Sequence, residues 1–172
     1  MRGLSIDDAP ALGVRRSDLV GRFRGPPVLA GIEVHVGDQW GVSADRVAAE
    51  CASFFSAANA VLRALDRRFP AQQLGALDPD AVRAIAETAA WMHAELIRIH
   101  PFVNGNGRLS RLVGNAVLVR YGLPPVLRLC PRPGGTYATA ASAAMLGDHM
   151  PMAEYVIDRI RERRSRPSPS VV

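Results

Sequence analysis

The sequence predicts one all-α domain that carries a single small β-hairpin. Apolar residues recur at helical spacing in five stretches between residues 44 and 164. β-forming residues instead gather in one short stretch, residues 28–36. At 172 residues and 18.5 kDa the chain is long enough to bury one core without disulfide or metal support.

The N-terminal part of the chain is predicted to contain little helix. Residues 1–19 show few periodic signals and are expected to form an irregular arm or a short helix. Gly25-Pro26-Pro27 breaks any helix, and the Val, Leu and Ile residues that follow are β-formers around Gly31 and Gly37. This pattern predicts a short hairpin within residues 22–42.

Two long helices are predicted next. Ser43 is a good N-cap for a core helix over residues 44–68, in which apolar residues return every three or four positions. A second helix begins at Asp78 with Pro79 in its first position, where the missing N–H of proline costs nothing. The apolar face of this helix continues up to His100.

Three further helices complete the prediction. One ends at Gly122, and two closing helices span residues 137–146 and 151–164. The last helix is expected to fray into a flexible basic tail over residues 163–172. The chain is therefore divided into an N-terminal arm, a domain over residues 20–162 and this tail.

Composition and charge exclude several classes of protein. There are 21 arginines and no lysine, which excludes a Walker-type or kinase-fold enzyme, a Schiff base and a lysine general base. A net charge of +5 brings nucleic acid into consideration. The basic cluster is terminal, however, so a nucleic-acid partner is disfavoured.

Location and redox state are predicted from the same composition. No apolar stretch approaches the roughly 20 residues of a membrane span, so we expect no membrane partner. The N-terminus lacks the features of a secretory signal, which predicts a cytoplasmic protein. Cys51 and Cys130 have no paired spacing, so we expect two buried reduced thiols and neither a disulfide nor a metal site.

The most informative stretch runs from His100 to Arg111, with the sequence HPFVNGNGRLSR. It combines a titratable imidazole, a glycine-paired turn and two arginines. Gly105 and Gly107 allow positive φ on either side of Asn106, and consecutive exposed N–H groups make a concave nest for anions. A helix that begins directly behind the turn adds its N-terminal N–H groups and dipole. The residues alone therefore predict a loop that handles phosphate.

This stretch resembles the signature of the Fic family, H-x-F-x-[D/E]-G-N-G-R-x-x-R, at every position except one. Asn104 stands where the family has an acidic residue. The resemblance covers about residues 20–162 and implies a Fic-fold helical bundle. The hairpin would then be a flap that pairs with an extended segment of a target protein, although a purely structural hairpin is an equal alternative.

The resemblance also implies a reaction, in which AMP passes from ATP to a hydroxyl of a target protein and pyrophosphate is released. His100 would be the general base for a Ser, Thr or Tyr hydroxyl, the alternative being a histidine that only caps its helix. Doc-like members, which transfer a phosphoryl group, carry lysine at the position of Gly107. Glycine at this position favours nucleotidyl transfer.

The nucleotide would be held along the loop. Gly105, Asn106 and Gly107 would contact the α-phosphate, with the Asn106 side chain as an additional donor. Arg108 would bind the β-phosphate and Arg111 the γ-phosphate, unless Arg111 is a solvated arginine on the helix face.

The family's acidic residue at position 104 helps to hold Mg²⁺ beside the phosphates. Hard cations prefer charged oxygen, so the neutral amide of Asn104 predicts weaker Mg²⁺ binding and reduced or lost activity.

Five residues near the loop are interpreted structurally. A hydrogen-bonded role bracing the loop is expected for Asn115, because asparagine is a poor helix former. His93 is expected to be a partly buried histidine and Glu95 a solvated carboxylate. For Tyr137 and Tyr155 two alternatives stay open, contact with the purine and packing in the core.

Three hypotheses for function stay open. The leading one is a protein AMP or NMP transferase, followed by a nucleotide-binding pseudoenzyme or regulatory module, and then by a different phosphate-linked transfer. Many Fic proteins are inhibited by a helix of pattern [S/T]-x-x-x-E-[G/N], but none of the six glutamates here has Ser or Thr four residues earlier. Either a separate antitoxin-like protein supplies that glutamate, or the protein is not inhibited in this way.

Overall fold

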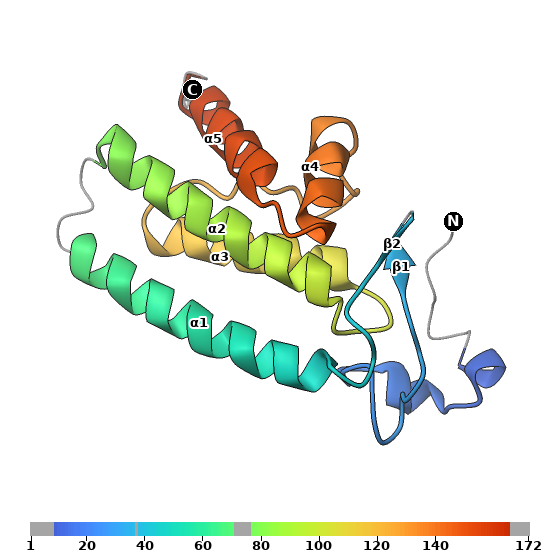
Figure 1. The fold of residues 1–172 in the computed structure, drawn as a ribbon. Helices are drawn as coiled ribbons and strands as arrows, with labels where there is room; N and C mark the ends of the chain where they lie inside the picture. Colours follow the sequence, from blue (N-terminus) through green and yellow to red (C-terminus); the bar gives the residue numbers. More distant parts are fainter. Residues whose placement is uncertain (1–8, 37, 71–76, 166–172) are drawn as a thin grey trace, which may run out of the picture.

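The computed structural model describes residues 9–36, 38–70 and 77–165, and within them it confirms an all-α architecture with one small hairpin (Figure 1). The hairpin pairs two short antiparallel strands, β1 and β2. Within these described ranges, no helix combines the length and the apolar character that crossing a membrane would require. The elements are β1 (His35–Val36), β2 (Gln39–Trp40), α1 (Val47–Arg68), α2 (Pro79–Ile99), α3 (Asn106–Arg120), α4 (Thr136–Met145) and α5 (Met150–Ser165).

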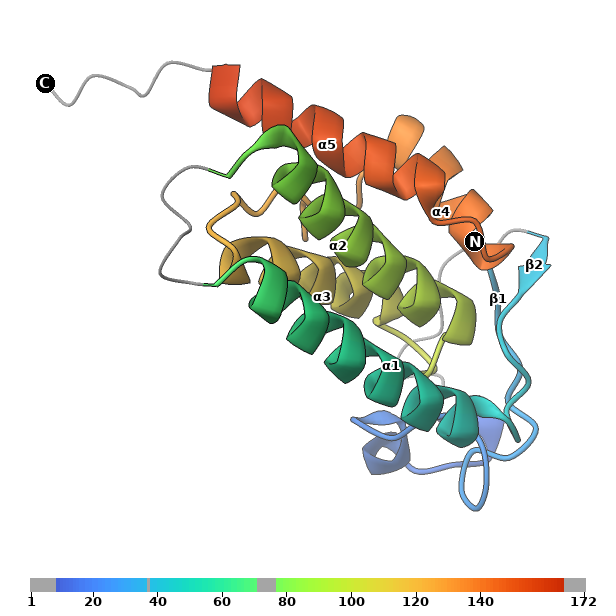
Figure 2. The same ribbon diagram turned by 60° about the vertical axis from the view of Figure 1, so that its left-hand side comes forward.

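Helix α2 is the centre of the bundle and packs against each of the other four helices. Figures 1 and 2 both show α1 and α5 on opposite sides of α2. Its sequence suits this position because it is rich in alanine and branched apolar residues, and twelve of its residues are buried on several faces. The helix that carries His100 at its end is therefore held from all sides.

Both ends of α2 agree with the prediction. The Asp78 carboxylate accepts a hydrogen bond from the N–H of Ala81 at 2.7 Å, and Pro79 is the first helical residue. At the other end, His100 is the C-cap in a left-handed conformation. This conformation turns the chain directly into the loop.

The start of α1 was predicted wrongly. The helix begins at Val47, and Ser43 lies in a preceding turn in which its carbonyl accepts from the N–H of Arg46 at 3.0 Å. Glu33 supplies the side-chain acceptor in this region, because its Oε1 atom lies 2.9 Å from the N–H of Ala44. Glu33 thus holds the turn before α1, while α1 itself has no side-chain cap hydrogen bond.

The hairpin lies within residues 22–42, as predicted, and its strands are at the end of this range. His35 pairs with Trp40 and Val36 with Gln39, so the second strand follows Gly37, which itself lies outside the described residues. The earlier β-formers make a tight turn in which Gly25 and Leu29 form an isolated bridge.

The arm before the hairpin is as irregular as predicted. It contains two short 3₁₀ turns, Pro10–Leu12 and Arg16–Leu19, and residues 1–8 lie outside the described part of the chain. Figures 1 and 2 show these turns close to the start of α1.

The C-terminal helices follow the prediction within a few residues. Helix α5 remains helical to Ser165, two residues beyond the start of the predicted tail, and residues 166–172 lie outside the described part of the chain. Cys51 is buried as expected, but the expectation for Cys130 was wrong because this thiol is exposed. Cys130 lies on the surface in the irregular connection between α3 and α4.

Candidate active site

His100 is placed and oriented by the end of α2. Its backbone has φ 52° and ψ 58°, and it is the only non-glycine residue with positive φ in the described part of the chain. The Nδ1 atom lies 2.9 Å from the carbonyl oxygen of Ile97. Because a carbonyl can only accept, Nδ1 carries the proton and the neutral ring keeps its lone pair on Nε2.

The surroundings of His100 favour the neutral ring. Burial lowers its pKa below the ordinary value of 6.5, and the charges of Arg24 and Arg132 act in the same direction. The hydrogen bond to Ile97 opposes this shift. His100 at pH 7 is therefore a neutral imidazole with Nε2 available to accept a proton.

The loop ends in an uncapped helix N-terminus. Gly105 is the N-cap of α3 with φ 89°, and no side chain caps the helix. Its carbonyl oxygen accepts from the N–H groups of Arg108 and Leu109, each at 3.0 Å. Within the described ranges, no hydrogen bond takes the preceding N–H groups of Asn106 and Gly107. Two N–H donors without a hydrogen bond and a helix dipole at one place are the features that favour anion binding.

The two glycines of the loop are needed for different reasons. Only Gly105 has positive φ, which corrects the expectation of positive φ on both sides of Asn106. Gly107 already belongs to α3, so its backbone is helical. A Cβ at this position would lie 3.2 Å from Nη1 of Arg111, so glycine here leaves room for that guanidinium.

Asn106 closes the loop on itself. Its Oδ1 accepts from the N–H of Phe102 at 2.8 Å, and its Nδ2 donates to the carbonyl of Phe102 at 2.7 Å. The side chain is buried, and the Phe102 ring packs against Phe23 with centroids 5.3 Å apart. Asn106 thus braces the loop, and one of its two side-chain N–H bonds is already used.

The two arginines of the motif lie in different environments. Arg108 is exposed, and its Nη2 lies 3.9 Å from where a Cβ on Gly105 would be. Arg111 is 3% exposed, donating from Nη1 to the Tyr137 hydroxyl at 3.2 Å and from Nη2 to the carbonyl of Leu129 at 3.0 Å. The alternative of a solvated helix-face arginine is therefore wrong for Arg111.

Behind Arg111 lies a buried polar chain through three helices. The Tyr137 hydroxyl, on α4, is 2.9 Å from Nε2 of His93 on α2. Burial lowers the pKa of His93 to about 3, with a further contribution from the charge of Arg111. His93 is therefore neutral, and Tyr137 accepts from Arg111 while donating to His93. Tyr137 is a core residue that holds Arg111, and Tyr155 packs edge-on against it at 5.6 Å.

Asn115 has the hydrogen-bonded role expected for it, but on a different segment. Its amide donates to the carbonyl of Leu127 at 2.7 Å and accepts from the N–H of the same residue at 2.9 Å. It therefore braces the connection between α3 and α4, the segment whose Leu129 carbonyl binds Arg111. Glu95 forms an ion pair with Arg98 at 2.8 Å.

The loop residues do not by themselves fit a magnesium site. Asn104 is exposed, and its Oδ1 accepts from the N–H of Gly105 at 2.6 Å. No carboxylate occurs between His100 and Arg111. In the part of the chain that is described, no three His, Cys, Asp or Glu residues gather in a metal-binding group. Mg²⁺ usually takes one or two carboxylates in addition to substrate phosphates.

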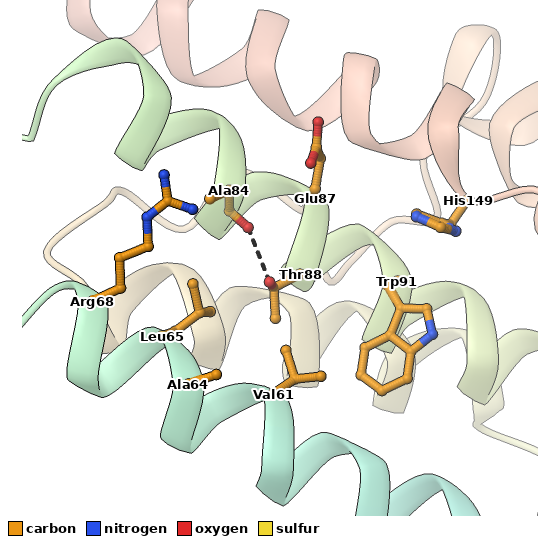
Figure 3. A pocket seen from close by; sticks show the side chains of 9 residues that line it. All are labelled: Val61, Ala64, Leu65, Arg68, Ala84, Glu87, Thr88, Trp91 and His149. Carbon is orange, nitrogen blue, oxygen red and sulfur yellow. Dashed lines mark hydrogen bonds between the residues drawn. The ribbon is translucent and has the colours of Figure 1, made fainter.

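A groove of about 420 Å³ lies elsewhere, between α1 and α2 (Figure 3). Trp91 is the lining residue of α2 nearest to His100 in sequence. His100 lies nine positions after Trp91, about 13 Å at the usual helical rise. The groove is therefore distinct from the loop. Its lining residues are Val61, Ala64, Leu65, Arg68, Ala84, Glu87, Thr88, Trp91 and His149.

Sequence reasoning missed two residues that shape this site. Arg24 donates to the backbone carbonyl of His100 at 2.8 Å, and a Cβ on Gly41 would lie 2.9 Å from the Cβ of His100. Neither residue belongs to the loop motif. Contacts between residues 59 and 76 positions apart leave no local pattern that could have predicted them.

Known proteins with similar sequences agree with the motif. Residues 38–118, from the hairpin to most of α3, match the model of the Fic/DOC family. Over 70 residues the chain is 41% identical to "Protein adenylyltransferase fic-1" of Caenorhabditis elegans, and over 50 residues it is 52% identical to "Protein adenylyltransferase Fic" of Nematostella vectensis. These matches cover 41% and 29% of this chain.

The chain thus spans only 14% and 12% of the length of these two curated relatives. A third relative, "Protein adenylyltransferase Fic" of Drosophila persimilis, is 40% identical over 70 residues, which are 41% of this chain and 14% of the relative. The matched region contains His100, the loop and both motif arginines. The Fic/DOC family model thus matches residues 38–118, slightly under half of this chain, and the three relatives carry Fic in their names.

Proposed function

We propose that this chain is a protein adenylyltransferase, which moves AMP from ATP to a Ser, Thr or Tyr hydroxyl of a target protein. The observation that carries the proposal is the pairing of a neutral imidazole, with its lone pair on Nε2, and an uncapped helix N-terminus in one loop. The names of the three relatives support the same activity.

His100 would act as the general base. Its Nε2 accepts the proton of the target hydroxyl as the hydroxyl oxygen bonds to the α-phosphorus. The bond between that phosphorus and the oxygen bridging to the β-phosphate breaks, and pyrophosphate leaves. The products are a phosphodiester on the target and pyrophosphate, with the proton on His100.

The N-terminus of α3 would stabilise the transferring phosphate. The N–H groups of Asn106 and Gly107 point out of the helix end and are fixed before reaction, so they meet the growing negative charge without rearrangement. Arg108 would bind the β-phosphate and Arg111 the γ-phosphate. Arg111 is held in place by Tyr137, which limits the reorganisation needed on binding.

Mg²⁺ is assigned no step in this proposal. Asn104 is the only residue proposed to contact it, and its neutral oxygen already accepts a hydrogen bond. The roles above belong to the side chains and backbone of the chain itself.

The test is transfer of label from ATP to protein in a lysate. Label from the α-phosphate should become attached to protein and label from the γ-phosphate should not, because AMP is the group transferred. His100→Ala should abolish transfer, whereas His149→Ala, in the groove between α1 and α2, should not change it. Equal transfer by wild type and His100→Ala would contradict the proposal.

A second function is favoured by Asn104. The missing carboxylate fits a regulatory module that binds a nucleotide without transferring it. Calorimetric binding of ATP, lost in Arg108→Ala, together with no labelled protein at any Mg²⁺ concentration, would favour this alternative.

A separate inhibitory protein is also proposed. None of the six glutamates in these 172 residues stands in the inhibitory pattern, and in this proposal a partner supplies one. Such a partner should lower transfer by the wild type and have less effect on Arg111→Ala. Because the reaction needs ATP, we further propose a cytoplasmic location.

A further inference from the structure

Arg24 is a fully buried arginine in the arm that precedes the hairpin. Its side chain has 0% exposure, and it lies fourteen positions before the region matched by the family model. A buried guanidinium is expensive unless its donors are satisfied. The contacts that satisfy Arg24 converge on His100 and on the base of the hairpin.

The first set of contacts holds the end of α2. Nε donates to the carbonyl of His100 at 2.8 Å, and Nη2 donates to the carbonyl of Ile99 at 3.2 Å. The backbone N–H of Arg24 donates to the carbonyl of Pro101 at 2.7 Å. Arg24 thus binds three consecutive carbonyls, which lie on both sides of the left-handed turn at His100.

The second set of contacts holds the chain on either side of the hairpin. Nη1 donates to the carbonyl of Ile32 at 2.9 Å, and Nη2 donates to the carbonyl of Val42 at 2.6 Å. Residues 32 and 42 flank β1 and β2. The same guanidinium therefore joins both ends of the hairpin to the backbone that carries His100.

A carboxylate balances the charge of Arg24, in addition to the backbone carbonyls that bind its donors. Glu33 lies 3.5 Å from Nη1, and its side chain is 41% exposed. Burial lowers the pKa of Arg24 and Glu33 opposes this, but arginine stays protonated in proteins. The guanidinium thus takes part in five polar interactions, four with backbone carbonyls and one with Glu33.

The packing beside Arg24 leaves no space between the hairpin and His100. A Cβ on Gly41 would lie 2.9 Å from the Cβ of His100 and 3.5 Å from Nη2 of Arg24. The chain leaving β2 therefore contacts the histidine directly. A shift of the hairpin would move Val42, the guanidinium or His100.

We propose that Arg24 is a positioning residue that fixes the backbone of His100, the proposed general base, relative to the hairpin. This proposal rests on the proposed adenylyltransferase function. Arg24 acts through the carbonyls of His100, Ile32 and Val42 and does not contact the reacting atoms.

Two substitutions separate the contribution of the Arg24 charge from that of its hydrogen bonds. Arg24→Met keeps much of the side-chain length and removes every donor, whereas Arg24→Lys keeps the charge and cannot bridge four carbonyls in one plane. Glu33→Gln is the first control, because it removes the charge partner and keeps an oxygen for the N–H of Ala44. Arg120→Met is the second, because it removes a surface arginine paired with Asp66.

The first measurement follows the His100 ring by NMR in labelled protein, with no nucleotide or target. Arg24 and Arg132 are the charged groups that act on His100, so Arg24→Met should raise its titration midpoint towards 6.5 and shift its ring resonances. Arg24→Lys should keep the low midpoint but still shift the resonances. Both controls should match wild type.

The second measurement is transfer of AMP to protein. Displacement of a catalytic group by about 1 Å can cost about 100-fold in rate, so kcat should fall by about this factor in Arg24→Met and Arg24→Lys. KM for ATP should change by less, since the α3 N-terminus is not bound by Arg24. The two controls should keep wild-type kcat.

Thermal unfolding by circular dichroism distinguishes positioning from stability. If Arg24→Met unfolds at lower temperature but, while folded, keeps the wild-type His100 resonances and kcat, the proposal is overturned. If Arg24→Met does not fold, unchanged resonances and kcat in Arg24→Lys overturn it. If the wild type itself transfers no AMP, the proposed function fails, and the NMR measurement still decides whether Arg24 positions His100.

Discussion

At the residue scale, the hydrogen bond between His100 and Ile97 decides which ring nitrogen can act. Nδ1 donates to the carbonyl, so Nε2 is the proton acceptor in the neutral ring. Burial then lowers the pKa, which keeps this acceptor available at a pH where an ordinary histidine would be partly protonated. The orientation of the His100 ring and its lowered pKa thus both favour the role of general base.

This pKa predicts the pH dependence of transfer. Since the base acts when neutral, kcat/KM should rise with pH and level off with a midpoint below 6.5, so that the active, neutral form predominates at pH 7. The measurement is kcat/KM for AMP transfer between pH 5 and 8. A midpoint above 6.5 would contradict the assignment of His100 as a buried, neutral base.

Asn104 leads to a second prediction at this scale. Asn104→Asp would place a charged oxygen in the loop and should raise Mg²⁺-dependent transfer, because hard cations bind carboxylates more strongly than amides. The measurement is transfer rate against Mg²⁺ concentration. Asn59→Asp, on the exposed side of α1, is the matched control for added charge. No gain in a fully active enzyme would show that the acid is dispensable.

At the element scale, α2, α3 and α4 are joined by a polar chain in an otherwise apolar core. Arg111 donates to Tyr137, and Tyr137 donates to His93, which burial keeps neutral. Buried polar chains of this kind hold their members in one arrangement, because any broken link leaves a polar group without a partner. The position of Arg111 is therefore set by two helices that lie outside the loop.

The buried His93 predicts how stability depends on pH. Its pKa is about 3 in the folded protein and 6.5 ordinarily, so below pH 6.5 the unfolded chain binds a proton that the folded protein cannot. The free energy of unfolding should therefore fall by up to about 1.4 kcal/mol per pH unit between roughly pH 6 and pH 4. Urea unfolding at several pH values measures this slope.

His93→Gln is the control for this slope. Glutamine can still accept from Tyr137 but does not titrate, so the decrease in stability towards low pH should become shallower. His149→Gln, in the groove between α1 and α2, should keep the wild-type slope. An unchanged slope in His93→Gln would show that His93 is not the group responsible.

At the scale of the whole molecule, the region that matches the family is only part of the folded unit. Residues 38–118 include α1, α2 and most of α3, but one side of α2 is covered by α4 and α5. From α5, the buried residues are Met152, Ala153, Val156, Ile157 and Ile160. Without this helix the centre of the bundle would lose its cover.

A truncated chain tests this dependence. A chain that stops after Gly147 should lose cooperative unfolding and bind a hydrophobic dye, because each larger apolar side chain of α5 contributes about 1.5 kcal/mol or more. Thermal melts by circular dichroism and dye fluorescence measure this. A chain that stops after Ser165 is the control, and two similar melts would contradict the expectation.

The parts that sequence reasoning predicted are those with local causes. Asp78 and Pro79 start α2, apolar periodicity outlines the five helices, and the loop motif is contiguous. The parts it missed depend on contacts distant in sequence. Glu33 holds the turn before α1 through the N–H of Ala44, and Arg24 contacts His100 across 76 positions. The burial of Arg111 likewise depends on residues of later segments.

The ring that Asn106 closes with the backbone of Phe102 has a consequence for nucleotide affinity. Two hydrogen bonds within the protein hold the loop in this shape. The conformational entropy of these residues is therefore lost during folding and not during binding. Less of the attraction between phosphate and loop is then offset by ordering of the loop, so the affinity for nucleotide is higher. A variant with a more flexible loop, such as Asn106→Ala, would bind nucleotide more weakly even though its backbone donors are intact.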